Sequence, residues 1–305
     1  MSNPTTETEL GCDETASPCT AIDRILRPRE ADLGGFFVRR SLPTAKLKMV
    51  GPWIFFDHMG PVEYPAGQGL NVRPHPHVGL ATVTYLFEGE ILHRDSIGSV
   101  QPIRPGDINL MIAGRGVTHS ESQEPSIKAR DHRLHGLQLW LALPRDYEDG
   151  APEFLHYPGA DIPETMACGV PVRVIMGSAY GCTSPVRTLS ETLYVEARLQ
   201  AGQTLRLPEA RERAVYVVQG HLRAMDSDIP EHTMAIFADE GGIIVEAIED
   251  TTVAIIGGDP LEKRYVEWNF VASSRERIDA AKQDWREGRF ALVPGDDSDP
   301  IPLPG

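Results

Sequence analysis

Short apolar segments, separated by turn residues about every ten positions, are the feature that most limits how this chain can fold. Residues 80–87 are rich in β-branched and aromatic side chains and end at a Glu-Gly-Glu break. Similar segments cover residues 91–96 and 108–112, and the turn Pro105-Gly106-Asp107 lies between them. β-Branched and aromatic residues favour strands, whereas proline, glycine and aspartate favour tight turns. Repeated at this spacing, the pattern predicts an all-β sandwich or barrel.

The second half of the chain repeats this organisation. Its strand-like segments are residues 172–176, 193–197, 214–218, 234–237, 243–247 and 252–258. Residues 216–220 (Tyr-Val-Val-Gln-Gly) correspond to residues 85–89 (Tyr-Leu-Phe-Glu-Gly) of the first half. A chain of 305 residues is long enough for two domains. We therefore expect a diverged internal duplication, with domains at residues 21–144 and 150–305 and a polar linker that begins at residue 145.

The two ends of the chain have a different composition. Residues 1–20 are rich in Ser, Thr, Glu and Asp and contain few large apolar residues, which predicts a flexible N-terminal tail. Residues 274–288 form the one segment with clear helix signals, because Ser273 or Ser274 can cap it and Gly288 lies where a helix stop belongs. The last residues, 294–305, combine prolines, glycines and aspartates and are expected to form a flexible, solvated end.

Two short polar pairs point to a metal site. His75 and His77 are separated by one residue, as are His119 and Glu121. On a strand, residues two apart point to the same face of the sheet. Two such strands lying side by side would bring three imidazoles and one carboxylate together, which suits a divalent transition metal. The corresponding positions of the second half contain no such pair, so we expect that domain to be metal-free.

Other histidines have simpler interpretations. A buried, hydrogen-bonded role is the favoured interpretation for His93 and His135. Asp57 and His58 have two open interpretations: they orient ligand imidazoles by accepting the second ring N–H, or they have only a turn-capping, structural role. We assign no function to the remaining histidines.

Composition and charge narrow the kinds of molecule that this protein is expected to bind. The formal net charge of −15 disfavours direct binding to nucleic acid or to an anionic membrane, since both select for Lys and Arg. It leaves a protein partner open. No apolar run reaches the roughly 18 residues that a membrane span needs, and the N-terminus shows no secretory pattern. The four cysteines include no Cys-x-x-Cys pair, so a cytoplasmic location is expected.

The central motifs resemble the pirin family, a branch of the cupins. The dense match covers about a third of the chain, and fainter similarity runs to residue 290. The matching motifs are Gly51-Pro52, Phe56-Asp57-His58, His75-Pro76-His77, residues 82–86, Glu88-Gly89-Glu90, His93-Arg94-Asp95-Ser96, Pro105-Gly106-Asp107, Met111, residues 113–116, His119-Ser120-Glu121 and residues 135–140. The resemblance implies two tandem cupin domains, each a double-stranded β-helix or jelly roll, followed by the C-terminal helix. It also implies an iron ion held by His75, His77, His119 and Glu121.

One stretch departs from the family pattern. Where many pirins read His-Pro-His-Arg-Gly-Phe-Glu-Thr, this chain has Val78, Leu80 and Ala81. Ordinary metal-binding cupins take a carboxylate ligand from about the position of Ala81. In the pirin pattern Glu121 supplies that carboxylate, so the site is retained while the pocket wall changes.

The expected chemistry follows from the ligand set and the resemblance. Three neutral imidazoles and a carboxylate leave two octahedral positions open, which suits Fe(II), Mn, Ni or Cu better than a closed structural zinc site, with Fe(II) the first choice and zinc an alternative. By resemblance we expect an iron-dependent dioxygenase that acts on flavonols with O2, of the quercetin 2,3-dioxygenase type. Glu121 would then be a ligand and a general base for the flavonol 3-hydroxyl. The alternative is a non-enzymatic, redox-sensitive iron protein that regulates a partner protein, and a weaker third is an isomerase, which needs no O2.

Overall fold

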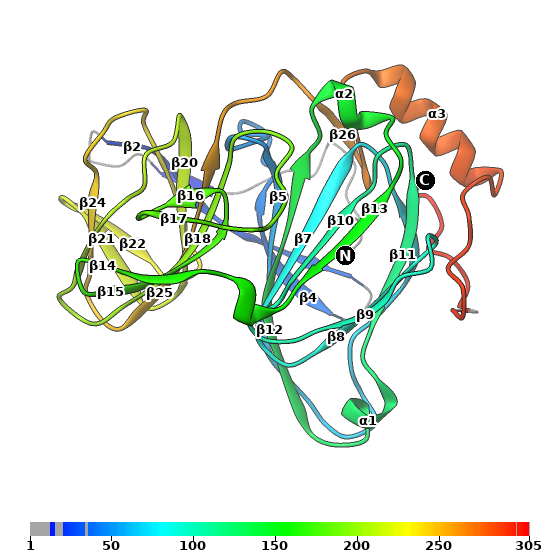
Figure 1. The fold of residues 1–305 in the computed structure, drawn as a ribbon, viewed down its shortest axis with the longest axis horizontal. Helices are drawn as coiled ribbons and strands as arrows, with labels where there is room; N and C mark the ends of the chain where they lie inside the picture. Colours follow the sequence, from blue (N-terminus) through cyan, green and yellow to red (C-terminus); the bar gives the residue numbers. More distant parts are fainter. Residues whose placement is uncertain (1–12, 16–20, 34–35, 297, 305) are drawn as a thin grey trace.

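The computed structural model describes residues 13–15, 21–33, 36–296 and 298–304. In these residues the protein is built mainly from antiparallel strands that form two sandwich domains, one large sheet and one small sheet in each. The domains stand side by side, and a helix and the C-terminal segment lie against the first of them (Figure 1). This confirms the predicted fold class of two tandem cupin domains with a C-terminal helix.

The first domain pairs a seven-stranded sheet with a four-stranded sheet. The large sheet has, in spatial order, β13 (Glu153–Tyr157), β10 (Ile108–Ile112), β7 (Leu80–Glu88), β12 (His132–Ala142), β5 (Trp53–Tyr64), β4 (Phe37–Leu42) and β3 (Arg29–Asp32). The small sheet has β6 (Asn71–His77), β11 (Val117–Ser122), β8 (Ile91–Asp95) and β9 (Val100–Ile103). Both segments that carry the predicted ligand pairs therefore lie next to each other in the small sheet.

The second domain repeats this plan with an eight-stranded sheet and a four-stranded sheet. The large sheet has β1 (Asp13–Thr15), β2 (Ile22–Arg27), β23 (Met234–Phe237), β20 (Glu212–Gln219), β25 (Thr251–Gly258), β18 (Thr192–Leu199), β15 (Val170–Met176) and β14 (Glu164–Ala167). The small sheet has β19 (Thr204–Arg206), β24 (Ile244–Ala247), β21 (His221–Ala224) and β22 (Ser227–Pro230).

The remaining elements connect or cover the sandwiches. They are the short helices α1 (Pro125–Lys128) and α2 (Arg145–Glu148), the 3-10 turn η2 (Gly159–Asp161), the hairpins β16 (Ser178–Ala179) with β17 (Cys182–Thr183) and β26 (Tyr265–Glu267) with β27 (Phe270–Ala272), and helix α3 (Arg275–Arg286). Ser274 caps α3 by accepting a hydrogen bond from the Arg277 N–H, and Gly288 follows the helix with a φ of 66°. Ile278 and Ala281 form its buried face. No helix within the described ranges has the length and apolar character that a membrane crossing requires.

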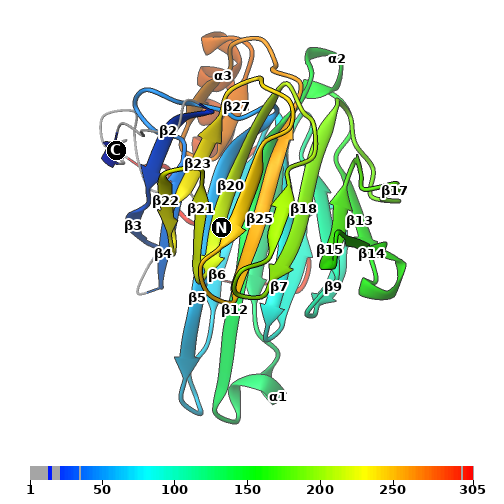
Figure 2. The ribbon, with the colours of Figure 1, turned by 90° about the vertical axis from the view of Figure 1, so that its left-hand side faces the viewer.

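The two large sheets face each other across an apolar core (Figure 2). Phe56, Val83 and Leu139 of the first domain pack there with Tyr216 and Ile256 of the second. The indole Nε1 of Trp53 also donates to the carbonyls of Leu193 and Gly257, at 3.1 Å each, across the junction. Burial of apolar surface contributes roughly 25 cal/mol per Å² to stability. The hydrophobic effect that forms the core of each domain therefore also holds the two domains together.

Several strands cross the domain boundaries that the sequence predicts. β2 belongs to the first predicted domain but pairs with β23 of the second. β13 lies at the start of the second predicted domain, residues 150–305, and pairs with β10 of the first. The predicted flexible tail at residues 1–20 lies mostly outside the described residues, although Asp13–Thr15 pairs with β2 as β1. The predicted flexible end at residues 294–305 contacts α3 and β6 through Ile301.

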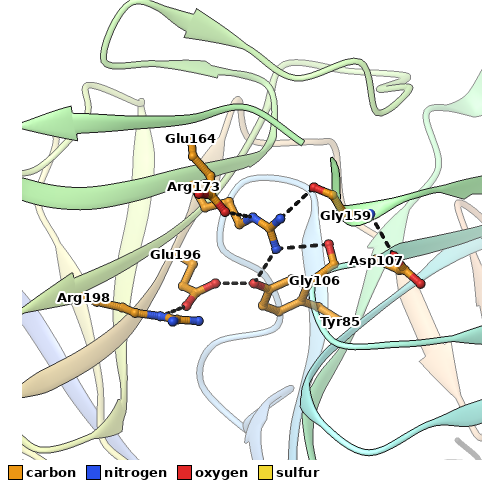
Figure 3. Close-up of polar contacts among 8 residues, drawn as sticks. All are labelled: Tyr85, Gly106, Asp107, Gly159, Glu164, Arg173, Glu196 and Arg198. Atoms are coloured by element: carbon orange, nitrogen blue, oxygen red, sulfur yellow. Dashed lines mark hydrogen bonds and ion pairs between the residues drawn. The ribbon is translucent and has the colours of Figure 1, made fainter. Parts of the chain in front are cut away.

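A network of hydrogen bonds and ion pairs links the two domains at their junction (Figure 3). The Tyr85 hydroxyl on β7 donates to the Glu196 carboxylate on β18. Arg173 on β15 donates to the Tyr85 oxygen at 3.3 Å and to the carbonyls of Gly106 and Gly159 at 3.1 and 2.7 Å. Tyr85 is 1% exposed and Glu196 is 4% exposed, so this network replaces water for groups that the junction buries.

Candidate metal centre

The candidate metal centre is built on two neighbouring antiparallel strands. In the pairing of β6 and β11, His119 lies opposite His75, and Val117 lies opposite His77. The register then shifts between His119 and Glu121, which marks a β-bulge. Side chains two apart share one face of a strand, so both histidines of β6 meet the histidine of β11 inside the first barrel. The sequence pattern predicted this arrangement of the three imidazoles.

The three imidazoles lie close enough to share one ion. Their ring centroids are 4.4 Å apart for His75 and His119, 4.8 Å for His77 and His119, and 5.0 Å for His75 and His77. One ligand nitrogen from each ring lies within 4.8 Å of the others. The two Nε2 atoms of His77 and His119 are 3.0 Å apart. Two nitrogens that each lie about 2.1 Å from one metal ion, at roughly a right angle, would have this separation.

The second nitrogen of two of these rings is held by backbone carbonyls. Nδ1 of His75 donates to the Arg73 carbonyl at 2.8 Å, and Nδ1 of His77 donates to the Asn269 carbonyl at 3.3 Å. These bonds leave the Nε2 atoms as the acceptors that a metal requires. Nε2 of His75 is buried and has no hydrogen-bond partner among the described residues. A buried polar atom without a partner is costly, and an ion at this point would satisfy it.

Burial keeps all three imidazoles neutral. It lowers the pKa of His75 to about 3, because burial and the nearby His93 outweigh the opposite effects of the Arg73 carbonyl and the Glu121 carboxylate. Burial, followed by the neighbouring histidines, lowers the pKa values of His77 and His119 well below their usual range. Since a metal ion binds the neutral imidazole, the site is prepared for coordination at ordinary pH.

A hydrogen-bonded chain extends from His119 away from the ligand nitrogens. Nδ1 of His119 lies 3.3 Å from Nδ1 of His93, and Nε2 of His93 donates to the Asp95 carboxylate at 3.0 Å. Asp95 is held in turn by the backbone N–H groups of Ile97 and Ser99. His93 therefore has the buried, hydrogen-bonded role that the sequence favoured, and it fixes the ring of His119.

Glu121 is buried on β11 but does not belong to the group of three mutually close ligands. The Gln138 side chain on β12 donates to its Oε1 at 2.5 Å and to Thr84 Oγ1 at 3.1 Å. Gln138 thus fixes the position of the carboxylate beside the histidines. The predicted roles of Glu121 as metal ligand and as catalytic base stay predictions.

Aromatic rings form the wall of the site. Trp140 stacks on Phe55 at a centroid distance of 3.8 Å and makes a T-shaped contact with His77 at a centroid distance of 5.0 Å. The Arg40 guanidinium lies 4.2 Å from the Phe55 ring centroid and pairs with Asp57 at 2.7 Å, with both charged groups fully buried. Asp57 is therefore the partner of Arg40, and it does not orient a ligand imidazole.

The three residues that depart from the family pattern pack in three different apolar clusters. Val78 packs with Trp268 and Phe270, whereas Leu80 packs with Phe55 and Trp140 beside the site. Ala81 lies in the core between the two domains. The substitution at Ala81 therefore affects the junction, and the one at Leu80 affects the aromatic wall.

Two sets of contacts near the site were not predicted from the sequence. His58 contacts His135 and Tyr216, with Nε2–Nε2 and Nδ1–Oη distances of 2.8 and 2.9 Å, and its ring lies 5.1 Å from that of His232. These residues come from both domains, so no local sequence pattern predicts that they contact one another. The carbonyl of Asn269 was also missed, because every residue carries a carbonyl and only the fold shows which one faces His77.

These features define a bicupin whose first barrel contains three converging histidines that could hold a metal ion. Residues 35–141 match the family described as Pirin, and residues 194–291 match the Pirin C-terminal cupin domain. The chain is 44% identical over 287 residues to a pirin-like protein of Caulobacter vibrioides, covering 93% of this chain and 99% of that protein. It is 31% identical to human pirin over 278 residues, which covers 87% of this chain and 91% of pirin. The chain belongs to the pirin family.

Solved structures agree with this assignment. The crystal structure of a quercetin 2,3-dioxygenase from Acinetobacter baumannii superposes with a TM-score of 0.85 at 32% identity, covering 92% of this chain and 94% of that one. The bacterial pirin YhhW of Escherichia coli, in complex with nickel(II), shares the fold with a TM-score of 0.59 at 19% identity. It covers 77% of this chain and 96% of YhhW.

Proposed function

We propose that this protein is an iron-dependent dioxygenase that cleaves flavonols with O2, in the manner of a quercetin 2,3-dioxygenase. The observation that carries the proposal is the convergence of three buried, neutral imidazoles, one of them with an Nε2 that has no partner among the described residues. The similarity to the Acinetobacter baumannii enzyme supports the choice of reaction and of substrate class.

The side chains of this site have distinct tasks in the proposed reaction. His75, His77 and His119 would hold the ion, with Glu121 as the fourth ligand. A bound redox-active divalent ion supplies Lewis acidity and electron exchange with O2. The Glu121 carboxylate, which accepts a hydrogen bond from Gln138, would accept the proton of a flavonol 3-hydroxyl. Trp140 and Phe55 offer an apolar, aromatic wall that excludes water from the reacting groups.

Iron is the proposed metal, and Mn, Ni, Cu and Zn are alternatives. The nickel(II) complex of YhhW supports nickel as one of these, although that protein is a distant relative. The metal-free character of the second domain and the cytoplasmic location also stay predictions. The proposed small-molecule partners are an aromatic flavonol and O2.

Metal analysis and oxygen uptake test the proposal together. We expect about one equivalent of metal in freshly purified protein and quercetin-dependent oxygen uptake by the iron-loaded form. His77→Ala should lose both, because it removes a ligand. His221→Ala, on β21 of the second domain, is the matched control and should retain both. Wild-type turnover by His77→Ala would contradict the assigned site.

One observation favours the alternative function, a redox-sensitive iron protein that regulates a protein partner without turnover. The three imidazoles are fully buried, which shields an ion there from bulk solvent. This function predicts metal binding without flavonol-dependent oxygen uptake. It also predicts that a partner binds the Fe(II) and Fe(III) forms with different affinity, which a pull-down from the two redox states would measure.

A further inference from the structure

The C-terminal segment returns to the first domain after the second domain is complete. The last strand of the second domain's large sheet, β25, ends at Gly258. The chain then forms β26, β27 and α3, and its final residues run beside β11 (Figure 1). This segment thus lies against the outside of the two strands that carry the candidate ligands.

The β27 hairpin contacts the chain directly around His77. The Asn269 carbonyl accepts the hydrogen bond from Nδ1 of His77, and Asn269 is fully buried. The Val271 N–H donates to the Val78 carbonyl at 3.0 Å, so the backbone of the hairpin is locked to the residue after the ligand. Gly79 allows this approach, because a Cβ at that position would lie 1.9 Å from the Val271 oxygen.

The tail makes an equivalent contact with the chain before His75. Nδ1 of His75 donates to the Arg73 carbonyl, so the placement of this backbone sets the ring orientation. The Ile301 N–H donates to the Pro74 carbonyl at 2.8 Å, and the Arg73 guanidinium donates to the Asp299 carbonyl at 3.2 Å. Trp285 of α3 secures the tail, because its Nε1 donates to the Ile301 carbonyl at 3.0 Å.

A third contact lies on β11. The Asp296 carboxylate lies near the side chain of Ser120, which lowers the pKa of that carboxylate. Ser120 lies between His119 and Glu121 and points to the opposite face of the strand. The same C-terminal segment therefore contacts the chain before His75, the chain around His77 and the residue between His119 and Glu121. It lies on the side of these strands that faces away from the candidate metal position.

We propose that the C-terminal segment, residues 265–304, is a positioning element of the metal centre. It fixes the ring of His77 through the Asn269 carbonyl and the backbone before His75 through Ile301, so that the Nε2 atoms converge. This inference rests on the proposed metal binding and adds a source of affinity that lies outside the ligands. Partners that orient ligand imidazoles typically contribute about 10–100-fold in metal affinity.

Two substitutions in the full-length chain test this role. Ile301→Pro removes the N–H that donates to Pro74, and Ile301→Val keeps both the N–H and an apolar side chain as its control. Trp285→Phe removes the donor to the Ile301 carbonyl and keeps an aromatic ring between Trp268 and Phe290. Leu292→Ala, at a residue that is 73% exposed, is the second control.

Cobalt(II) is the probe, because its visible absorption bands report ligand geometry as well as binding. We expect the Co(II) dissociation constant of Ile301→Pro to rise by about 10-fold or more, with altered bands, and that of Trp285→Phe to rise less. Both controls should match the wild type. Far-UV circular dichroism of the metal-free variants checks their folding, and Trp285→Phe decides the question if Ile301→Pro is unfolded.

The outcomes separate this inference from the proposed function. Wild-type Co(II) affinity and spectrum in both Trp285→Phe and a folded Ile301→Pro would overturn the positioning role while leaving the metal site intact. Failure of the wild-type protein itself to bind Co(II) or Fe(II) would overturn the proposed function instead.

Discussion

The hydrogen bond between Tyr85 and Glu196 offers a direct test of how the two domains are coupled. Tyr85 is on β7 of the first domain, and Glu196 is on β18 of the second (Figure 3). Burial, followed by the charge of Glu196, raises the pKa of the Tyr85 phenol, so it remains a neutral donor to the carboxylate. Tyr85→Phe removes this hydroxyl donor, so a buried oxygen of the Glu196 carboxylate loses the hydrogen bond from Tyr85.

The expected cost follows from the kind of bond that is lost. Hydrogen bonds to charged groups contribute about 1.5–3 kcal/mol, so we expect Tyr85→Phe to lower the free energy of unfolding by about 2 kcal/mol. Glu196→Gln weakens the same bond and the ion pair with Arg198, whose side chain is 66% exposed and which therefore contributes less than about 1 kcal/mol. The double variant should cost less than the sum of the single variants, with a coupling of about 1 kcal/mol or more.

Urea unfolding followed by tryptophan fluorescence measures these values. Trp53 is a suitable reporter because it bonds to two carbonyls of the second domain and lies edge-on to Tyr194 at 5.7 Å. Tyr147→Phe is the matched control, since Tyr147 is 42% exposed and surface changes usually stay within about 0.5 kcal/mol. Additive single effects, or a Tyr85→Phe variant indistinguishable from this control, would refute the reasoning.

Two further predictions concern acid and backbone strain. Burial lowers the pKa of His58 well below its usual value, and burial with the nearby charges of Arg133, His232 and Arg39 lowers that of His135 to about 4. As the pH falls below about 6.5 the unfolded chain binds these protons first, so stability should fall between pH 6.5 and 4. Thermal unfolding of the wild type and of His135→Gln at several pH values measures this, and an equal slope in the two proteins would exclude His135 as a source. Gly79→Ala should destabilise the protein more than Gly98→Ala in the same assay, because both glycines have positive φ but only Gly79 faces a backbone oxygen within 4 Å. Equal losses would show that φ strain alone accounts for the effect.

Local patterns predicted the parts of the structure that depend on local physics. The alternation in His75-Pro76-His77 placed both rings on one face of β6, and His119 on β11 lies opposite His75. The cap at Ser274 and the stop at Gly288 gave helix α3 almost to the residue. In each case the side chain and its immediate neighbours decide the conformation.

Long-range pairing could not be read in the same way. Nothing in residues 22–27 indicates that β2 joins the sheet of the second domain, because a short strand with a few buried apolar residues would suit either sheet. His58 on β5 and His135 on β12 lie on neighbouring strands of the first domain, and His232 of the second domain lies beside His58 because the two domains pack together. These contacts depend on which faces of the sheets bury the most apolar surface when they pack together. A short stretch of sequence does not contain that information.

The metal centre shows why a ligand motif is an incomplete description of such a site. A chain that ended with β25 would contain both barrels, all three histidines and Glu121. It would lack the Asn269 carbonyl that holds His77 and the Ile301 N–H that holds the backbone before His75. Ligand identity is a property of the side chains, whereas the directions of the His75 and His77 rings depend on backbone carbonyls, which any residue can supply. The two barrels are built on similar plans, and the C-terminal return to the first one distinguishes it as the barrel in which we propose that an ion is held.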